Sequence, residues 1–387
     1  MKRLLLVRVY QEAPHPAYSQ PLGIMYLASY LRERRPEVEV KLLDMRLTRM
    51  APEGLRAEIA AFKPDCVGLS VLSFEAATLP ACARVVKEYD HGVAVIVGGP
   101  HASSDSETIL RDENVDLCVI GEGEETLLEL VDKGLGAESL GEVAGVAYRA
   151  PDGAYARNAA RDYIEGVDDL PFPAWDMIDV LAYSDIQSMN NMLARSPYMA
   201  IFTSRACPYR CAYCHEVFGK TFRARSVENV IAEMRHVYDV YGVREFHIVD
   251  DIFNWDPDRA GAIMDAIVEA GMDVKIAFPN GVRADRMTPE LVRKFARAGT
   301  YAMSVAVETA SPRLQGVIEK HNDLDKVRRT INEAYKAGII VKGFFMLGFP
   351  TETPEEIEAT IDFAVKSRCL ISGFFTVVPF PGSTLYD

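Results

Sequence analysis

The sequence predicts an α/β protein built from two successive domains. Its 387 residues exceed what a single hydrophobic core usually serves. Short apolar runs alternate with helical stretches over the first 150 residues and again from Tyr198 onward, whereas residues from about 140 to 195 break this rhythm. We therefore expect a first domain over residues 1–140, a linker with a small hairpin over 141–195, and a second domain over 196–387.

The first domain is predicted to be a flavodoxin-like, doubly wound parallel sheet. Its apolar runs are bounded by Gly, Pro and Asp, which is typical of parallel strands buried on both faces. Such a fold binds its ligand at the carboxyl ends of the strands. The predicted strands are Leu4–Val9, Val38–Leu43, Cys66–Val71, Ala94–Val97 and Leu117–Ile120.

The stretch that follows is predicted to be ordered although it has no βα rhythm. LGEVAGVAYRAPDGAYAR indicates a hairpin that turns at Pro151-Asp152-Gly153. DDLPFPAWDMID is rich in proline and aromatic residues and indicates a packed linker.

The second domain is predicted to be a partial, TIM-like (β/α)6 barrel. Right-handed crossovers between parallel strands would curl the sheet and place a site at the carboxyl ends of the strands. The chain stops directly after the sixth predicted strand, so we expect a fragment that lacks the next helix. The predicted strands are Met199–Ser204, Glu245–Val249, Val274–Phe278, Tyr301–Val307, Val341–Leu347 and Gly373–Val378.

Composition argues against several classes of function. The net charge is −14 and no basic stripe stands out, which argues against nucleic-acid binding. No apolar run reaches the roughly 18 residues that a membrane span requires, and the first residues do not form a signal peptide. We expect a cytoplasmic protein whose seven cysteines are ligands or core residues, not disulfides.

Three of these cysteines form a motif on the loop after the first barrel strand. In SRACPYRCAYCHEVFGK, Cys207, Cys211 and Cys214 have the spacing C-x3-C-x2-C. A four-iron cluster held by three cysteines leaves one iron open to chelation, whereas most iron–sulfur clusters use four. Zinc on these cysteines and His215 is the alternative, but adjacent Cys214 and His215 close a tetrahedron awkwardly. The motif therefore favours a [4Fe–4S] cluster.

C-x3-C-x-aromatic-C after a first βα strand resembles the radical S-adenosylmethionine (SAM) superfamily. The resemblance implies that SAM chelates the open iron and is cleaved to methionine and a 5′-deoxyadenosyl radical. It also implies SAM contacts beside the cysteines and at the ends of the barrel strands. Asp251 and Asn280 lie at such strand ends too. The implied SAM-binding residues are Tyr213, Asp250, Arg283, Glu308 and Gly348.

Motifs of the first domain make the resemblance more specific. PLGIMYLASYL, VGLSVLSF, GGPHAS and GEGEETLLEL, followed by LPFPAWD and the cysteine motif, resemble the cobalamin-binding radical SAM family. The resemblance implies a corrin bound between the domains, although Gly-rich stretches are also common as plain turns. The implied cobalamin contacts are Ser70, Ser73, Gly98, Gly99, His101, Gly121 and Gly123.

The sequence also departs from other cobalamin proteins. D-x-H-x-x-G, whose histidine ligates cobalt in many of them, is absent. His15 lies in the equivalent loop but lacks the aspartate and the spacing, so we expect no protein ligand on cobalt. Cys66 and Cys118 lie in apolar strands and Cys82 in a helix, which favours core positions over a second cluster. Cys369 is expected to be structural too.

These expectations define an enzyme with three cofactors: a [4Fe–4S] cluster, SAM and cobalamin. The resemblance implies methylation of an unactivated carbon through a 5′-deoxyadenosyl radical and methylcobalamin. It implies a small-molecule, lipid or peptide substrate and an external electron donor such as flavodoxin or ferredoxin. Two alternatives stay open: a cyclase or rearrangement enzyme with the same cofactors but no methyl transfer, and a non-catalytic corrinoid or metal carrier.

Overall fold

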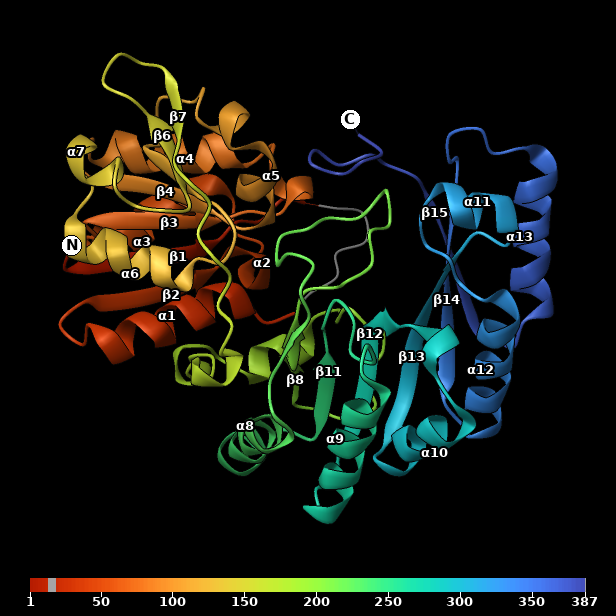
Figure 1. The fold of residues 1–387 in the computed structure, drawn as a ribbon. Helices are drawn as coiled ribbons and strands as arrows, with labels where there is room; N and C mark the ends of the chain where they lie inside the picture. Colours follow the sequence, from red (N-terminus) through yellow and green to blue (C-terminus); the bar gives the residue numbers. More distant parts are fainter. Residues whose placement is uncertain (13–18, 387) are drawn as a thin grey trace. The chain divides into compact units, whose positions relative to one another are not determined.

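The computed structural model describes residues 1–12 and 19–386. The chain divides into two compact units, Met1–Ile186 and Gln187–Asp387 (Figure 1). The predicted hairpin and most of the predicted linker lie within the first unit. In that unit Trp175 is buried, and the backbone N–H of Ala174 donates to the carbonyl of Met25.

The first unit contains a seven-stranded sheet in the order β2-β1-β3-β4-β5-β6-β7. Strands β1 to β5 are parallel and have the flavodoxin-like order that the sequence predicts. The predicted hairpin is present, and it extends this sheet by two antiparallel strands, a pairing that was not predicted. The strands are β1 (Arg3–Arg8), β2 (Glu39–Asp44), β3 (Cys66–Ser70), β4 (Ala94–Gly98), β5 (Leu117–Val119), β6 (Val146–Arg149) and β7 (Tyr155–Arg157).

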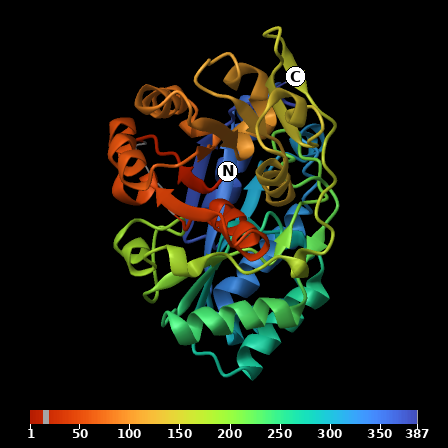
Figure 2. The same cartoon turned by 90° about the vertical axis from the view of Figure 1, so that its left-hand side faces the viewer.

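Helices cover both faces of this sheet, as Figure 1 and Figure 2 show. Helices α1 (Leu22–Arg34) and α6 (Glu124–Lys133) supply apolar residues to one core layer. Helices α3 (Leu55–Phe62), α4 (Leu79–Tyr89) and α5 (Pro100–Ile109) supply the other. The two layers bury alternate side chains of the central strands, which explains why β1, β3, β4 and β5 are largely apolar.

Three cysteines of the first unit lie in these layers, as predicted. Cys66, Cys82 and Cys118 are fully buried, and each thiol is unpaired. Burial raises the pKa of Cys82 and Cys118 to about 12. They behave as small core residues.

The second unit contains a six-stranded parallel sheet in the order β15-β14-β13-β12-β11-β8. All six predicted strands are present. The strands are β8 (Tyr198–Ile201), β11 (Glu245–Ile248), β12 (Lys275–Val282), β13 (Thr300–Glu308), β14 (Ile340–Leu347) and β15 (Ile371–Thr376). The helices are α8 (Val227–Val240), α9 (Pro257–Glu269), α10 (Pro289–Arg297), α12 (Leu324–Lys336) and α13 (Pro354–Lys366).

Local sequence signals explain where these helices begin. Asp256 and Thr288 precede prolines, and each side chain accepts a backbone N–H of the first helical turn. Two short elements were not predicted, namely helix α11 (Pro312–Val317) and the pair formed by β9 (Ser204–Arg205) and β10 (Arg223–Ala224). The β9–β10 pair closes the loop that carries the cysteine motif.

Residues 187–195, which the sequence assigned to the linker, belong to the second unit. Both backbone N–H groups of Ala194 and Arg195 donate to one carboxylate oxygen of Glu245, at 2.7 and 2.6 Å. Glu245 is fully buried, and His247 and Tyr301 contact its other oxygen. This network fixes the segment at the start of the barrel strands. Across the described part of the chain, no helix is long and apolar enough to cross a membrane.

Candidate active site

The three cysteines of the motif line one cavity of about 390 Å³ at the carboxyl ends of the barrel strands. Cys207, Cys211 and Cys214 are partly buried and unpaired. The loop between them is held by hydrogen bonds from the Cys214 N–H to the Cys211 carbonyl and from Lys220 Nζ to the Tyr209 carbonyl. Parallel strands bring their loops to a common edge, which explains why distant sequence segments meet here.

The donor set fits a cluster better than a single metal ion. Among the residues described, no three His, Cys, Asp or Glu side chains converge tightly enough to hold one ion. Zinc needs all its ligands within about 2.0–2.3 Å of a single centre, whereas His215 directly follows Cys214 in the chain. A [4Fe–4S] cluster spreads its thiolates over separate irons, which suits three thiols facing one cavity. Burial raises the pKa of Cys214 to about 11, so iron binding must displace its proton.

Tyr213, Glu308 and Lys320 form a polar group in the same cavity. The Tyr213 hydroxyl donates to Glu308 Oε1 at 2.9 Å, and Lys320 Nζ lies 3.3 Å from that oxygen. Burial and the Glu308 carboxylate raise the pKa of Tyr213, so its hydroxyl keeps its proton. Burial opposes the charge on Lys320, but the combined attraction of Glu308, Cys211 and Cys214 outweighs it and raises the pKa of the amine. Tyr213 and Glu308 were predicted as site residues, whereas Lys320 was not.

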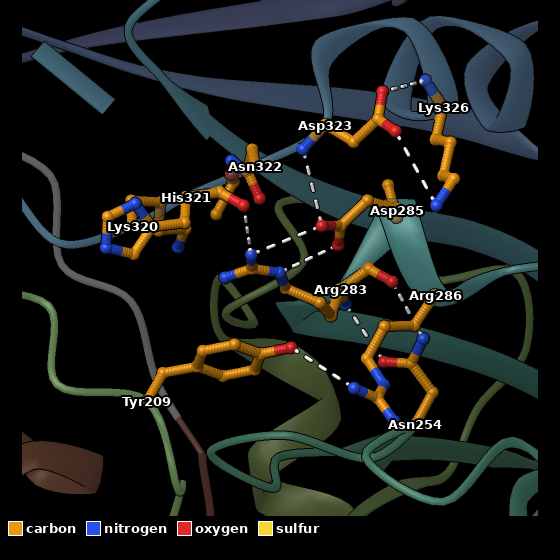
Figure 3. Close-up of polar contacts among 12 residues, drawn as sticks. Tyr209, Asn254, Arg283, Asp285, Arg286, Lys320, His321, Asn322, Asp323 and Lys326 are labelled. Atoms are coloured by element: carbon orange, nitrogen blue, oxygen red, sulfur yellow. Dashed lines mark hydrogen bonds and ion pairs between the residues drawn. The ribbon is translucent and has the colours of Figure 1, made fainter. Parts of the chain in front are cut away.

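Arg283 lines the cavity with a fixed orientation, as Figure 3 shows. Its guanidinium donates to both carboxylate oxygens of Asp285, at 2.7 and 3.2 Å, and to the carbonyl of His321 at 3.0 Å. The Asn254 amide binds both backbone groups of Arg283 at 2.9 Å. The guanidinium also lies 4.0 Å from the centre of the Tyr209 ring. These contacts connect the cysteine loop to the end of β12.

Two predicted SAM contacts are not placed in the cavity. The carboxylate of Asp250 accepts hydrogen bonds from the Thr203 N–H, the Thr203 hydroxyl and the Ser204 hydroxyl, each at 2.6 Å. Asp250 is buried and therefore braces the chain that leads to the cysteine loop. Gly348 follows β14, outside the cavity lining, and its N–H donates to Glu352. Asp251, the residue after Asp250, lines the cavity instead.

The predicted cobalamin contacts lie along the carboxyl edge of the parallel sheet in the first unit. Ser70 ends β3, Gly98 ends β4, and Gly99 and Gly123 directly precede α5 and α6. The remaining predicted contacts, Ser73, His101 and Gly121, lie in η2 (Ser73–Glu75), in α5 and in the turn after β5. Flavodoxin-like folds bind their ligands at this edge.

Ser103, which was not predicted as a site residue, connects Gly99 to Gly121. The Ser103 hydroxyl donates to the Gly99 carbonyl at 3.2 Å and accepts the Gly121 N–H at 2.9 Å. Gly99 has a φ of 94°, and an added Cβ would lie 2.9 Å from the carbonyl oxygen of Val71. A Cβ at Gly98 or Gly121 would meet nothing within 4 Å, so open space borders the edge at both positions.

His101 supplies a polar atom to this edge. The side chain is 8 % exposed, and Nδ1 has no hydrogen-bond partner among the described residues. Burial lowers the pKa of His101, so the ring is neutral near pH 7. A buried ring nitrogen that lacks a partner among the described residues fits a polar group of a ligand at this edge. His15 lies outside the described residues.

Comparison with known protein families matches both units. The radical SAM superfamily matches residues 201–364, and the B12 binding domain matches residues 15–131. The chain is 31 % identical over 370 residues to an uncharacterized methyltransferase of Pyrococcus horikoshii, covering 95 % of this chain and 78 % of the relative. It is 29 % identical over 423 aligned residues to cytidylyl-2-hydroxyethylphosphonate methyltransferase of Streptomyces wedmorensis, covering 96 % and 78 %.

Two further comparisons bear on the fold and on the reaction. An anaerobic magnesium-protoporphyrin IX monomethyl ester cyclase of Rubrivivax gelatinosus is 24 % identical over 372 residues, covering 95 % of this chain and 66 % of the cyclase. The methyltransferase TsrM from Kitasatospora setae, solved with cobalamin and a [4Fe–4S] cluster, has the same fold. It superposes with a TM-score of 0.78 at 19 % identity, covering 100 % of this chain and 77 % of TsrM.

Proposed function

The chain belongs to the cobalamin-binding radical SAM family, and from this membership we propose that it methylates an unactivated carbon of its substrate. The family makes the protein an enzyme whose cofactors are a [4Fe–4S] cluster, SAM and cobalamin. The main support for methyl transfer is the methyltransferase relative that is 31 % identical and aligns with nearly the whole chain. This membership excludes the carrier without catalytic activity.

When bound, the cluster and SAM supply a 5′-deoxyadenosyl radical, and cobalamin supplies the methyl group. The protein's own tasks are binding, orientation and exclusion of water. We assign cluster ligation to Cys207, Cys211 and Cys214, since they are the thiols that line the cavity.

The polar residues of the same cavity would bind SAM. Lys320 and Arg283 are cations that can attract its carboxylate, and the Glu308 carboxylate can accept hydrogen bonds from ribose hydroxyls or the amino group. Tyr213 offers a ring for stacking beside the cysteines and holds Glu308 through its hydroxyl. Asp250 supports the loop from behind and does not contact the ligand in this assignment.

The carboxyl edge of the first sheet would bind cobalamin. Gly98, Gly99 and Gly121 allow the backbone to approach the corrin, and His101 offers Nδ1 to a polar group on its periphery. Ser70, Ser73 and Gly123 complete this edge. The absence of D-x-H-x-x-G from the sequence supports a cobalt without a protein ligand.

The cyclase relatives favour one alternative, which is radical ring formation without methyl transfer. Both reactions need the same cofactors, so the product decides between them. Reconstituted enzyme with a reducing partner such as flavodoxin or ferredoxin would be incubated with SAM and with panels of small molecules, lipids and peptides. A product heavier by one CH2, together with S-adenosylhomocysteine and 5′-deoxyadenosine, supports methylation. An unchanged carbon count with 5′-deoxyadenosine alone would establish the cyclase class.

A further inference from the structure

Gln315, a buried residue of α11, makes three side-chain hydrogen bonds around the Glu308–Lys320 pair. Its amide Nε2 donates to the carbonyls of Val307 and Thr309, at 2.9 and 2.7 Å. These two carbonyls belong to the residues on either side of Glu308. The amide oxygen Oε1 accepts the N–H of Asn322 at 3.0 Å. The side chain is 4 % exposed, so water does not replace these bonds.

The main chain of Gln315 holds the other partner of the pair. Its carbonyl accepts the N–H groups of Lys320 and His321, at 3.1 and 3.2 Å. The Asn322 amide then donates to the carbonyls of Ala306 and Val307, at 3.0 and 3.3 Å. One residue therefore ties the end of β13 to the loop that carries Lys320.

The backbone held in this way is in an unfavourable conformation. Glu308 has a φ of 66°, and Glu319 and His321, which flank Lys320, have φ values of 53° and 51°. Residues with a Cβ seldom adopt the left-handed region and stay there when surrounding contacts fix them. Without the Gln315 amide, Glu308 is free to return to an extended conformation, which would turn its carboxylate away from Tyr213 and Lys320.

We propose that Gln315 is a positioning residue for SAM binding: its amide holds Glu308 and the Lys320 loop in the conformation that faces the cavity. The inference rests on the proposed function, because it assumes that Glu308 and Lys320 bind SAM. Gln315 itself does not line the cavity and acts through these two residues.

The test compares SAM affinity with stability in the full-length, reconstituted protein. Gln315→Met keeps the length of the side chain and removes all its hydrogen bonds. Gln315→Glu keeps the acceptor and replaces the donors with an oxygen that faces two carbonyls. We expect both variants to retain iron and to raise the Kd for SAM by roughly tenfold, since two or three buried hydrogen bonds are lost. The Kd is measured by equilibrium dialysis with labelled SAM.

Thr360→Val is the matched control for a buried hydrogen bond near the same strand end. Thr360 is fully buried, and its hydroxyl accepts the Ala310 N–H at 3.0 Å and lies 3.3 Å from the Thr309 hydroxyl, without contacting Glu308 or Lys320. It should lower the thermal midpoint as the Gln315 variants do, yet leave the Kd for SAM unchanged. An equal loss of affinity in Thr360→Val would show general destabilisation and overturn the proposal.

A double-mutant cycle tests the positioning role of Gln315 separately from the proposed SAM-binding function. If Gln315 acts through Glu308, the effects of Gln315→Glu and Glu308→Gln on the Kd should be far from additive. Additive effects, or wild-type affinity in both Gln315 variants, would refute the positioning role while SAM binding by the wild type stands. A wild type that retains iron and fails to bind SAM would instead refute the proposed function.

Discussion

The hydroxyl of Tyr213 donates a hydrogen bond of 2.9 Å to the carboxylate of Glu308, although the two residues lie 95 positions apart in the sequence. The bond joins the cysteine loop to the end of β13. The buried carboxylate of Glu308 thus has two partners, the neutral hydroxyl of Tyr213 and the cation of Lys320. The pair therefore connects the cluster-binding loop to the part of the cavity that would hold SAM.

Tyr213→Phe should weaken SAM binding without loss of iron. The variant keeps the ring and removes a hydrogen bond to a charged acceptor, which is typically worth about 1.5–3 kcal/mol. We expect the Kd for SAM to rise roughly tenfold. Tyr209→Phe in the same loop is the control, because the Tyr209 hydroxyl has a marginal contact of 3.5 Å with Arg286. Equal affinities in the two variants would contradict the role given to Tyr213.

Glu308→Gly and Glu308→Ala should differ in stability although both remove the carboxylate. Glu308 has a φ of 66°, which glycine adopts without the penalty that alanine carries. We expect Glu308→Gly to be more stable by about 1 kcal/mol in chemical unfolding. Both variants should bind SAM equally poorly. A glycine variant that is less stable than the alanine variant would show that the backbone is not strained there.

Apolar runs and cap residues predicted the fold because the central strands, such as β3 and β4, are buried on both faces and the helices of the second unit begin at recognisable caps, such as Asp256 before α9 and Thr288 before α10. The hairpin at residues 146–157 was predicted too, but its pairing with β5 was not, since antiparallel edge pairing has no signal of its own in the strands. The sequence singles out the cysteine motif and Tyr213 because their spacing lies within one loop, and all four residues line the same cavity.

Other site residues could not be assigned from the sequence. Asp250 and Asp251 are adjacent at a strand end, and neighbouring side chains point to opposite sides. Asp250 binds Thr203 and Ser204, whereas Asp251 lines the cavity. Lys320 lies in an irregular loop whose position depends on Gln315, so no local pattern marks it. Tertiary contacts decide such cases.

Variants of the motif cysteines should lose iron, whereas variants of the other cysteines should keep it. Cys211→Ala should lose the cluster and SAM cleavage, because a [4Fe–4S] cluster with an open iron needs all three thiolates. Cys82→Ala, which alters a buried core thiol, should keep about four irons per chain. Iron and sulfide assays after anaerobic reconstitution measure both variants. Retention of a full cluster in Cys211→Ala would refute the ligand assignment.

Glu356 should make stability depend on pH in the acid range. Hydrogen bonds from Arg313 and Ser311 lower the pKa of Glu356 from 4.5 to about 2. The folded state therefore favours the ionised form, and its contribution is present above pH 4.5 and lost as the pH falls toward 2. Glu356→Gln should lower the thermal midpoint at pH 7, with the difference from wild type shrinking below pH 4. A difference that stays constant with pH would exclude the ionised carboxylate as its cause.

Replacement by alanine should change the stability of the protein differently at Gly98 and at Gly99, although the two residues are adjacent in the chain. A Cβ at Gly99 would lie 2.9 Å from the Val71 carbonyl oxygen, and its φ of 94° disfavours any side chain. Gly99→Ala should therefore lower the free energy of unfolding by about 1–3 kcal/mol. A Cβ at Gly98 meets nothing within 4 Å, so Gly98→Ala should change stability by less than about 0.5 kcal/mol.

Cobalamin affinity tests whether Gly98 and Gly99 border a ligand-binding site or only form a turn. If the corrin approaches the backbone at Gly98, the added methyl group of Gly98→Ala occupies space that the ligand needs, and affinity for hydroxocobalamin should fall without loss of stability. Absorbance titration of the reconstituted protein gives the affinity, and chemical unfolding gives the stability. Gly136→Ala, in the loop after α6, is the control, because a Cβ there also meets nothing within 4 Å, its φ of −69° suits alanine, and α6 separates it from the carboxyl edge. Cobalamin affinity unchanged in Gly98→Ala would mean that the corrin does not approach the end of β4.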